Sequence, residues 1–208
     1  MFFEEFLSKL DQIQSKELGG LDAQFKLAPK LRLRYNQQKI DANNPKKAAV
    51  LSLFYPNAEN KTSFLLTLRA SYNGKHSSQI SFPGGKIEAT DKNLKETAVR
   101  EAFEEVGILK EDIQIVRETT DVYIPPSNFL ATPFIAYTNQ RPTFTKNYEV
   151  AALIEVSVED LLNEANITST TMTTSYMEKI EVPCFKLNDY IVWGATAMML
   201  SEIKELLK

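Results

Sequence analysis

The chain has 208 residues, of which 43% are hydrophobic and 25% charged, and this ordinary globular composition excludes a disordered or collagen-like protein. It carries 24 Lys and Arg against 27 Asp and Glu, and a net charge of −3 excludes a generally basic nucleic-acid-binding protein. The single cysteine, Cys184, excludes an intrachain disulfide framework, and the single histidine, His76, leaves one candidate for a zinc site or a catalytic triad. A bound metal ion would therefore be held mainly by carboxylates.

The amino-terminal segment is expected to form one amphipathic helix that ends near Gly19-Gly20. Its apolar residues recur at three- and four-residue spacing: Phe2, Phe3, Phe6, Leu7, Leu10 and Ile13. The polar face is not basic, so we expect packing on the domain or on a partner subunit of a homodimer, and no membrane contact. Glu4 and Glu5 replace the positive charge of a secretory signal, and no apolar run approaches the ~18 residues of a membrane span, which favours a cytoplasmic location.

The segment that follows is strongly basic, with a single acid, Asp41. Pro29 and the Asn-Asn-Pro of residues 43–45 predict that most of it is loop. We expect residues 1–45 to form an amino-terminal helix and basic loop that pack on a domain of residues 46–208. The basic side chains are either solvated or in contact with phosphate groups of a substrate: Lys26, Lys30, Arg32, Arg34, Lys39, Lys46 and Lys47.

Alternating apolar patterns after this segment predict a mixture of strands and helices. Two strands begin at Ala48 and Ser63 and are separated by a turn-rich PNAENK. A helix is predicted from about Asn93 to Val106, ended by Gly107. No repeat or linker divides the chain, so we expect one α+β domain with a mixed sheet. The remaining predicted elements are strands at Ile113, Phe134 and Val150, a short helix at Val158–Leu162 and a final helix from about Ala195 to Leu207.

The helix near the middle of the chain carries the residues that could bind a metal or act in catalysis. At ~100° per residue, Val99, Phe103 and Val106 form a narrow apolar stripe that we expect to face the core. Three acids fall within ~100° of one another on the opposite side: Glu101, Glu104 and Glu105. They form either the solvated face of an amphipathic helix or a cation site.

The positions of these acids favour the cation site. Like charges at i,i+3 and i,i+4 repel, each pair costing roughly 0.2–0.5 kcal/mol, and Glu104 and Glu105 stand at the negative end of the helix dipole. A divalent cation with a preference for oxygen ligands explains this arrangement. Arg100 can pair with Glu96 and Glu104, and the Gly84-Gly85 pair lets the backbone approach the metal or a phosphate.

The order of these residues resembles the Nudix box, G-x5-E-x7-R-E-U-x-E-E-x-G-U. Two features depart from that pattern: Asp91 is the first acid, and eight residues instead of seven separate it from Arg100. Ala102 occupies a position that is usually bulky and apolar. The matching residues are Gly85, Arg100-Glu101, Glu104-Glu105 and Gly107-Ile108.

The departures resemble the coenzyme A pyrophosphatase branch of the Nudix family. That branch has a second signature, roughly LLTxR followed by a variable stretch and G-x3-FPGG. Residues 65–69 read LLTLR and residues 82–85 read FPGG, with Ser78 at the position of the signature glycine. Residues 124–128, 149–150 and 193–197 are also similar to that branch.

The resemblance implies an α/β/α sandwich with a mixed sheet between helices. It implies a metal-dependent hydrolase that cleaves the diphosphate of coenzyme A or acyl-coenzyme A into 3′,5′-ADP and 4′-phosphopantetheine or its acyl form. The alternatives are a Nudix hydrolase of another nucleoside diphosphate derivative such as ADP-ribose, and a nucleotide-sensing module without catalysis. The partner would be a small nucleotide and not a nucleic acid.

The resemblance also implies residue roles. Glu101 and Glu105 would be the principal ligands of Mg²⁺ or Mn²⁺, with the Gly85 carbonyl completing the shell. Glu104 would be a further ligand or would activate water. The implied catalytic set is Glu104, Arg100 and Glu101, the substrate-binding set is Arg69, Phe82 and Gly84, and Glu149 is a second candidate base.

Overall fold

A mixed β-sheet forms the centre of the computed structural model, which describes residues 1–70, 79–174 and 177–208. Its long strand β1 (Lys46–Pro56) runs parallel to β7 (Phe129–Tyr137) and antiparallel to β2 (Thr62–Arg69). This combination confirms the predicted mixed sheet and the strands predicted at residues 48, 63 and 134. The other strands of this sheet are β3 (Ile80–Ser81), β4 (Gly84–Lys86), β5 (Gln114–Glu118), β6 (Val122–Ile124) and β8 (Val150–Ser157).

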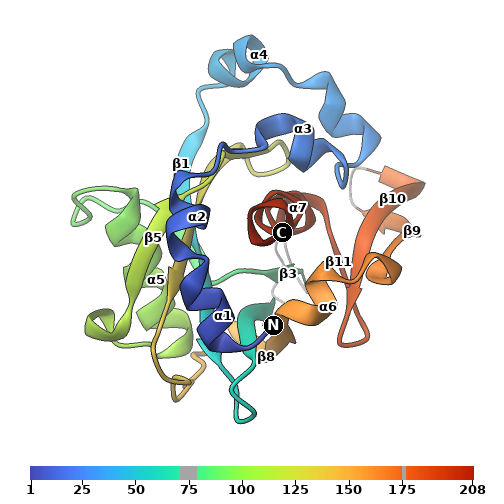
Figure 1. The fold of residues 1–208 in the computed structure, drawn as a ribbon. Helices are drawn as coiled ribbons and strands as arrows, with labels where there is room; N and C mark the ends of the chain where they lie inside the picture. The colour runs from blue at the N-terminus through green and yellow to red at the C-terminus, as the bar shows by residue number, and fades with distance from the viewer. Residues whose placement is uncertain (71–78, 175–176) are drawn as a thin grey trace.

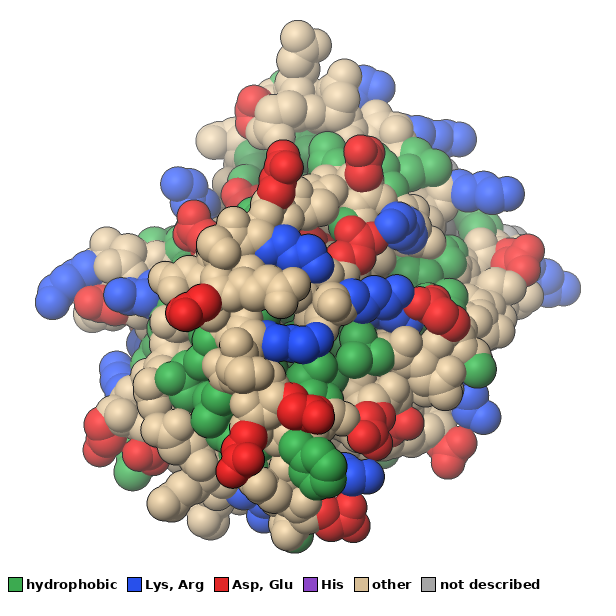
Figure 2. Space-filling model, viewed as in Figure 1, with side chains coloured by type: hydrophobic (Ala, Val, Ile, Leu, Met, Phe, Trp, Pro, Cys, Tyr) green, Lys and Arg blue, Asp and Glu red, His purple; other side chains and the backbone are tan. Residues whose placement is uncertain are grey.

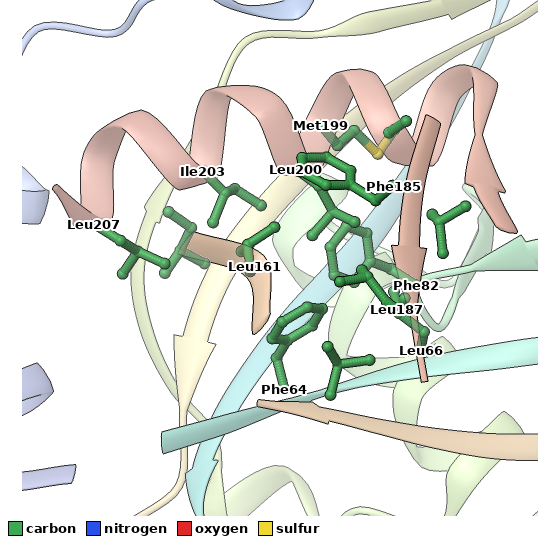
Figure 3. Close-up of a cluster of buried hydrophobic side chains, with 14 of the residues drawn as sticks. Phe64, Leu66, Phe82, Leu161, Phe185, Leu187, Met199, Leu200, Ile203 and Leu207 are labelled. Atoms are coloured by element: carbon green, nitrogen blue, oxygen red, sulfur yellow. The ribbon is translucent and has the colours of Figure 1, made fainter. Parts of the chain in front are cut away.

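Helices cover both faces of this sheet. Helix α5 (Leu94–Val106) packs on one face, and α7 (Gly194–Leu207) packs on the other with α6 (Val158–Leu162). Side chains of β1 alternate between the two cores, because successive residues of a strand point to opposite faces. Leu53 and Tyr55 pack with the α5 side, whereas Phe54 packs with the α7 side. Figure 3 shows Leu200 and Ile203 pointing from α7 toward the strand that carries Phe64. The expected α/β/α sandwich is confirmed.

A separate three-stranded sheet was not predicted. It consists of β9 (Ile167–Thr174), β10 (Met177–Leu187) and β11 (Tyr190–Trp193), and α7 lies between it and the main sheet (Figure 1). The sequence of β9, ITSTTMTT, is threonine-rich and mostly exposed, so it lacks the apolar alternation that marks a half-buried strand. Cys184 on β10 is free and buried, as expected for a small hydrophobic residue.

The amino-terminal region contains several short helices, and the prediction of one helix up to Gly19-Gly20 is wrong. The helix breaks at Lys9, which separates α1 (Phe3–Ser8) from α2 (Leu10–Ser15), and Lys16 is extended. Phe2 leaves the apolar stripe because its backbone bridges to Lys61, which keeps its side chain 54% exposed. Phe3, Phe6 and Ile13 are buried, so the remaining stripe packs on the domain.

The basic segment is also more regular than predicted. After α3 (Gly20–Phe25) it forms a 3-10 turn, η1 (Lys30–Arg34), and α4 (Gln37–Ala42). Asn36 caps α4 by accepting a hydrogen bond from the backbone N–H of Lys39 at 3.0 Å. The loop prediction is wrong for these residues, because Asn36 supplies a helix cap that proline and asparagine content alone does not reveal. Two further 3-10 turns are η2 (Lys110–Asp112) and η3 (Glu164–Asn166).

The described surface shown in Figure 2 carries Lys and Arg side chains interspersed with Asp and Glu, in agreement with the near-neutral net charge. Within the described ranges, no helix is long and apolar enough to cross a membrane.

Candidate active site

Helix α5 lies close to the sheet because its buried face is made of small residues. Ala98 and Ala102 are completely buried, and Val106 is buried beside them. The expected stripe is therefore wrong in part: Phe103 is 46% exposed and Val99 is only half-buried. Alanine permits a closer approach of the helix to the sheet than phenylalanine does, so the helix packs through its alanine face. The adjacent face, with Glu101 and Glu105, then points toward β4.

The three acids of α5 differ in their surroundings. Glu105 is buried and accepts a hydrogen bond from the Gly84 N–H at 3.1 Å, and burial raises the pKa of Glu105 to about 7. The Glu101 carboxylate lies directly over Gly85, where a Cβ atom would come 2.3 Å from Glu101 Oε1. Burial also raises the pKa of Glu101 above its ordinary value. Only Glu104 is exposed, so the acids do not form a single solvated face.

Arg100 holds this acidic cluster together. Its Nε and Nη2 donate to both carboxylate oxygens of Asp91 at 2.9 Å, and its Nη1 donates to Glu101 at 3.0 Å and Glu104 at 3.1 Å. The bidentate Arg100 guanidinium keeps the pKa of Asp91 far below its usual range. The predicted pair with Glu104 is confirmed, whereas the pair with Glu96 is wrong, because the Glu96 carboxylate accepts from a backbone N–H in the turn before α5.

The donor chemistry of the cluster fits a hard divalent cation. In the described parts of the chain, no three acidic, histidine or cysteine side chains converge as a closed metal cage. Mg²⁺ does not need such a cage, because it commonly binds one or two carboxylates together with water and substrate phosphates. Glu101 and Glu105 approach the same Gly84-Gly85 strand, and Glu149 adds to the negative potential that raises the pKa of each. A cation would offset this concentrated negative charge.

Replacing Gly85 with alanine is expected to displace Glu101, because the new methyl group would occupy the space of its carboxylate. Glu101 has a flexible side chain, so the melting temperature should change little. Misplacing a reacting group by about 1 Å can cost on the order of 100-fold in rate, and we expect a loss of roughly 10- to 100-fold. Steady-state hydrolysis and a thermal melt would measure both effects, and an unchanged rate would contradict the assigned position of Glu101.

A cavity of about 960 Å³ lies beside the carboxylate cluster, with Gly84 and Gly85 in its wall. Ile124, Pro125 and Phe129 provide an apolar side to the cavity. The described residues that line it include no acid, whereas five basic residues from separate parts of the chain do so: Arg32, Arg34, Lys39, Arg69 and Lys86. The cavity therefore suits an anionic ligand with an apolar part.

The residues predicted to bind substrate lie along this cavity. Arg69 is half-buried in its wall, with Nη2 3.4 Å from a carboxylate oxygen of Glu149. Phe82 contributes to the wall but is only 2% exposed and packs near Phe64, so its main environment is the core. Trp193, which sequence resemblance placed in a family-like segment, is half-buried and also lines the cavity.

Some cavity residues had no signal that distinguished them in the sequence. Tyr35 and Lys86 line the cavity, yet Tyr35 lies outside both signatures and Lys86 occupies a variable position of the Nudix box. Arg32, Arg34 and Lys39 were three of seven basic residues in one segment, and charge alone did not separate them from the other four. His76 and Ser78, which the sequence comparison included, lie outside the described residues.

The NUDIX domain family model matches residues 45–174, which include the carboxylate cluster and all eight strands of the central sheet. The chain belongs to the Nudix family. A solved MutT/Nudix family protein from Enterococcus faecalis has a TM-score of 0.53 and 14% identity, with 78% of this chain and 62% of that chain covered. At this identity the structural similarity supports the fold alone.

Two curated relatives are informative about the branch. A peroxisomal coenzyme A diphosphatase, ndx-8, of Caenorhabditis elegans is 28% identical over 73% of this chain and 64% of its own length. An uncharacterized Nudix hydrolase, NudL, of Pectobacterium atrosepticum is 31% identical over 68% of this chain and 73% of its own length. The match thus spans somewhat less than two thirds of the worm protein.

Proposed function

We propose that this Nudix protein is a metal-dependent diphosphatase that hydrolyses coenzyme A or acyl-coenzyme A to 3′,5′-ADP and 4′-phosphopantetheine or its acyl form. The observation that carries the proposal is the juxtaposition of the carboxylate cluster with a large cavity lined by five basic residues. Coenzyme A is polyanionic and also has a long, uncharged arm that includes methyl and methylene groups. Similarity to the coenzyme A diphosphatase of Caenorhabditis elegans supports the same substrate class.

The carboxylates near Gly84 and Gly85 would hold the cation. Glu101 and Glu105 would be its principal ligands, with Glu104 and the Gly85 carbonyl as further candidates. Bound Mg²⁺ or Mn²⁺ would neutralise diphosphate charge and lower the pKa of water. Arg100 would keep Glu101 and Glu104 oriented through its hydrogen bonds at 3.0 and 3.1 Å.

The remaining groups would bind the substrate and move a proton. Arg69 lies at the cavity wall beside Glu149 and would bind a diphosphate oxygen. Glu104 is exposed and can receive a proton from the attacking water, with Glu149 as the second candidate base. The water oxygen would form a bond to phosphorus as the bridging P–O bond breaks, leaving one phosphate on each product.

A substrate panel tests the proposal. The purified protein would be incubated with coenzyme A, acetyl-coenzyme A and ADP-ribose in the presence of Mg²⁺ or Mn²⁺, and the products separated by chromatography. We expect equimolar 3′,5′-ADP and 4′-phosphopantetheine from coenzyme A. Efficient cleavage of ADP-ribose with intact coenzyme A would support the alternative Nudix hydrolase. Tight nucleotide binding without cleavage of any substrate would support the sensing module.

The cytoplasm is the compartment we propose for this activity. The free, buried Cys184 is compatible with a reducing environment.

A further inference from the structure

Residues that precede the matched Nudix segment form one wall of the cavity. The family match begins at residue 45, yet Arg32, Tyr35 and Lys39 line the cavity together with Arg34. In Figure 1 the chain from α3 to α4 passes over α7 before it enters β1, and we call this segment, residues 20–43, the arch. The basic segment is therefore part of the candidate binding site and not a separate solvated loop.

The start of this arch is anchored to α7 by a buried carboxylate. Glu202 is completely buried and accepts hydrogen bonds from the Gly20 N–H at 2.9 Å and from Gln24 Nε2 at 3.1 Å. Thr120 donates to the same carboxylate through its hydroxyl at 2.6 Å and its N–H at 3.2 Å. Four donors satisfy this buried charge, which ties α3 to both α7 and the loop before β6.

The end of the arch is anchored to the central sheet. The Tyr123 hydroxyl accepts from Asn43 Nδ2 at 3.0 Å and donates to Asn128 Oδ1 at 3.0 Å. The Tyr35 ring lies 5.3 Å from the Tyr123 ring, between centroids. These contacts hold the arch at both ends, which limits the entropy that its basic side chains would lose on binding a ligand.

The basic residues of the cavity form two sets. Arg69 and Lys86 lie next to the carboxylate cluster, since Arg69 contacts Glu149 and Lys86 follows Gly85 directly. The second set comes from the arch, where Lys39 Nζ donates to the Arg34 carbonyl at 3.1 Å. The first set adjoins the residues that would act on a diphosphate, whereas the second set lines a different part of the cavity wall and would meet a different anionic group.

We propose that Arg34 and Lys39, with Arg32, form a second phosphate-binding subsite that recognises a phosphate monoester on the ribose of the substrate. The choice of a ribose phosphate rests on the proposed coenzyme A activity, because that substrate has a 3′-phosphate in addition to its diphosphate. Arginine and lysine bind phosphate oxygens through charge-assisted hydrogen bonds. The subsite distinguishes 3′-phosphorylated nucleotides from those with an unmodified ribose.

Calorimetric binding of 3′,5′-ADP and 5′-AMP, without metal and without turnover, tests this subsite directly. The wild-type protein should bind 3′,5′-ADP about tenfold or more tightly than 5′-AMP, and higher salt should reduce the difference. The double substitution Arg34→Ala and Lys39→Ala should abolish the preference while leaving 5′-AMP binding and the melting temperature unchanged. Lys30→Ala is the matched control, since Lys30 is an exposed base of the same segment that does not line the cavity.

Equal wild-type affinity for the two nucleotides, or a preference that survives the double substitution, would overturn the subsite. Parallel assays with coenzyme A and dephospho-coenzyme A separate this result from the proposed function. Cleavage of both substrates with a KM ratio unaffected by the double substitution would reject the subsite and retain the diphosphatase. A 3′-phosphate preference in binding without any cleavage of coenzyme A would retain the subsite and reject the diphosphatase.

Discussion

Replacing Glu105 with glutamine is expected to reduce diphosphate hydrolysis by a factor on the order of 100 or more while leaving the fold intact. The amide oxygen can still accept the hydrogen bond that Gly84 N–H now donates at 3.1 Å. The substitution removes the negative charge that would bind a cation, and an amide is a weaker ligand for Mg²⁺. The metal-free variant should be at least as stable as wild type, because a buried carboxylate becomes a neutral group.

Glu111→Gln is the matched control for this experiment. Glu111 is an exposed acid in η2, outside the cavity wall. Its substitution makes the same charge change and should leave the rate unchanged. Activity would be measured over a range of Mg²⁺ concentrations, and metal affinity by calorimetry. A Glu105→Gln protein with wild-type rate and metal affinity would remove Glu105 from the metal site.

Replacing Arg100 with alanine is expected to lower the free energy of unfolding by about 3 kcal/mol, because Asp91 would become a buried charge without its cation. Both side chains of this pair are largely buried, with exposed fractions of 12% for Arg100 and 4% for Asp91. Hydrolysis should also fall, since Glu101 and Glu104 lose a shared donor. Urea denaturation followed by circular dichroism would measure the stability change.

The effect of Arg100→Ala should depend on pH in a defined direction. The folded pKa of Asp91 lies below its unfolded value, so the pair contributes stability above about pH 4 and loses it as the pH falls further. The stability difference between wild type and variant should therefore shrink below about pH 4. Lys92→Ala removes an exposed pair, with 3.8 Å between Lys92 and Glu96, and should cost no more than about 0.5 kcal/mol. Equal effects of the two substitutions would contradict a stabilising role of the Arg100–Asp91 pair.

The local parts of this fold could be predicted from the sequence. Asn93 caps α5 and Gly107 ends it at a φ of 76°, and both signals are read from single residues. The apolar runs of β1 and β2 likewise reflect burial on both faces. The clustering of acids on α5 follows from helical spacing alone, and so the sequence was sufficient to predict an oxygen-ligand cation site.

The orientation of α5 depended on the tertiary structure. Periodicity favoured a face with Phe103, but the helix packs through Ala98 and Ala102. A hydrophobic pattern ranks residues by polarity, whereas packing selects the face that fits the distance to the sheet. This rotation of α5 about its axis buries Glu105, and no spacing rule predicts that an acid will be buried.

The sequence by itself determined the helix that carries the acids, the strands that support it and the family to which the chain belongs. Only the tertiary structure decided which basic residues line the cavity beside those acids. Arg34 and Lys39 precede Gly85 by 51 and 46 residues in the sequence. They reach the cavity because Glu202 and Tyr123 anchor the arch. Local patterns report short-range conformation, whereas a binding site requires long-range packing that brings distant segments together.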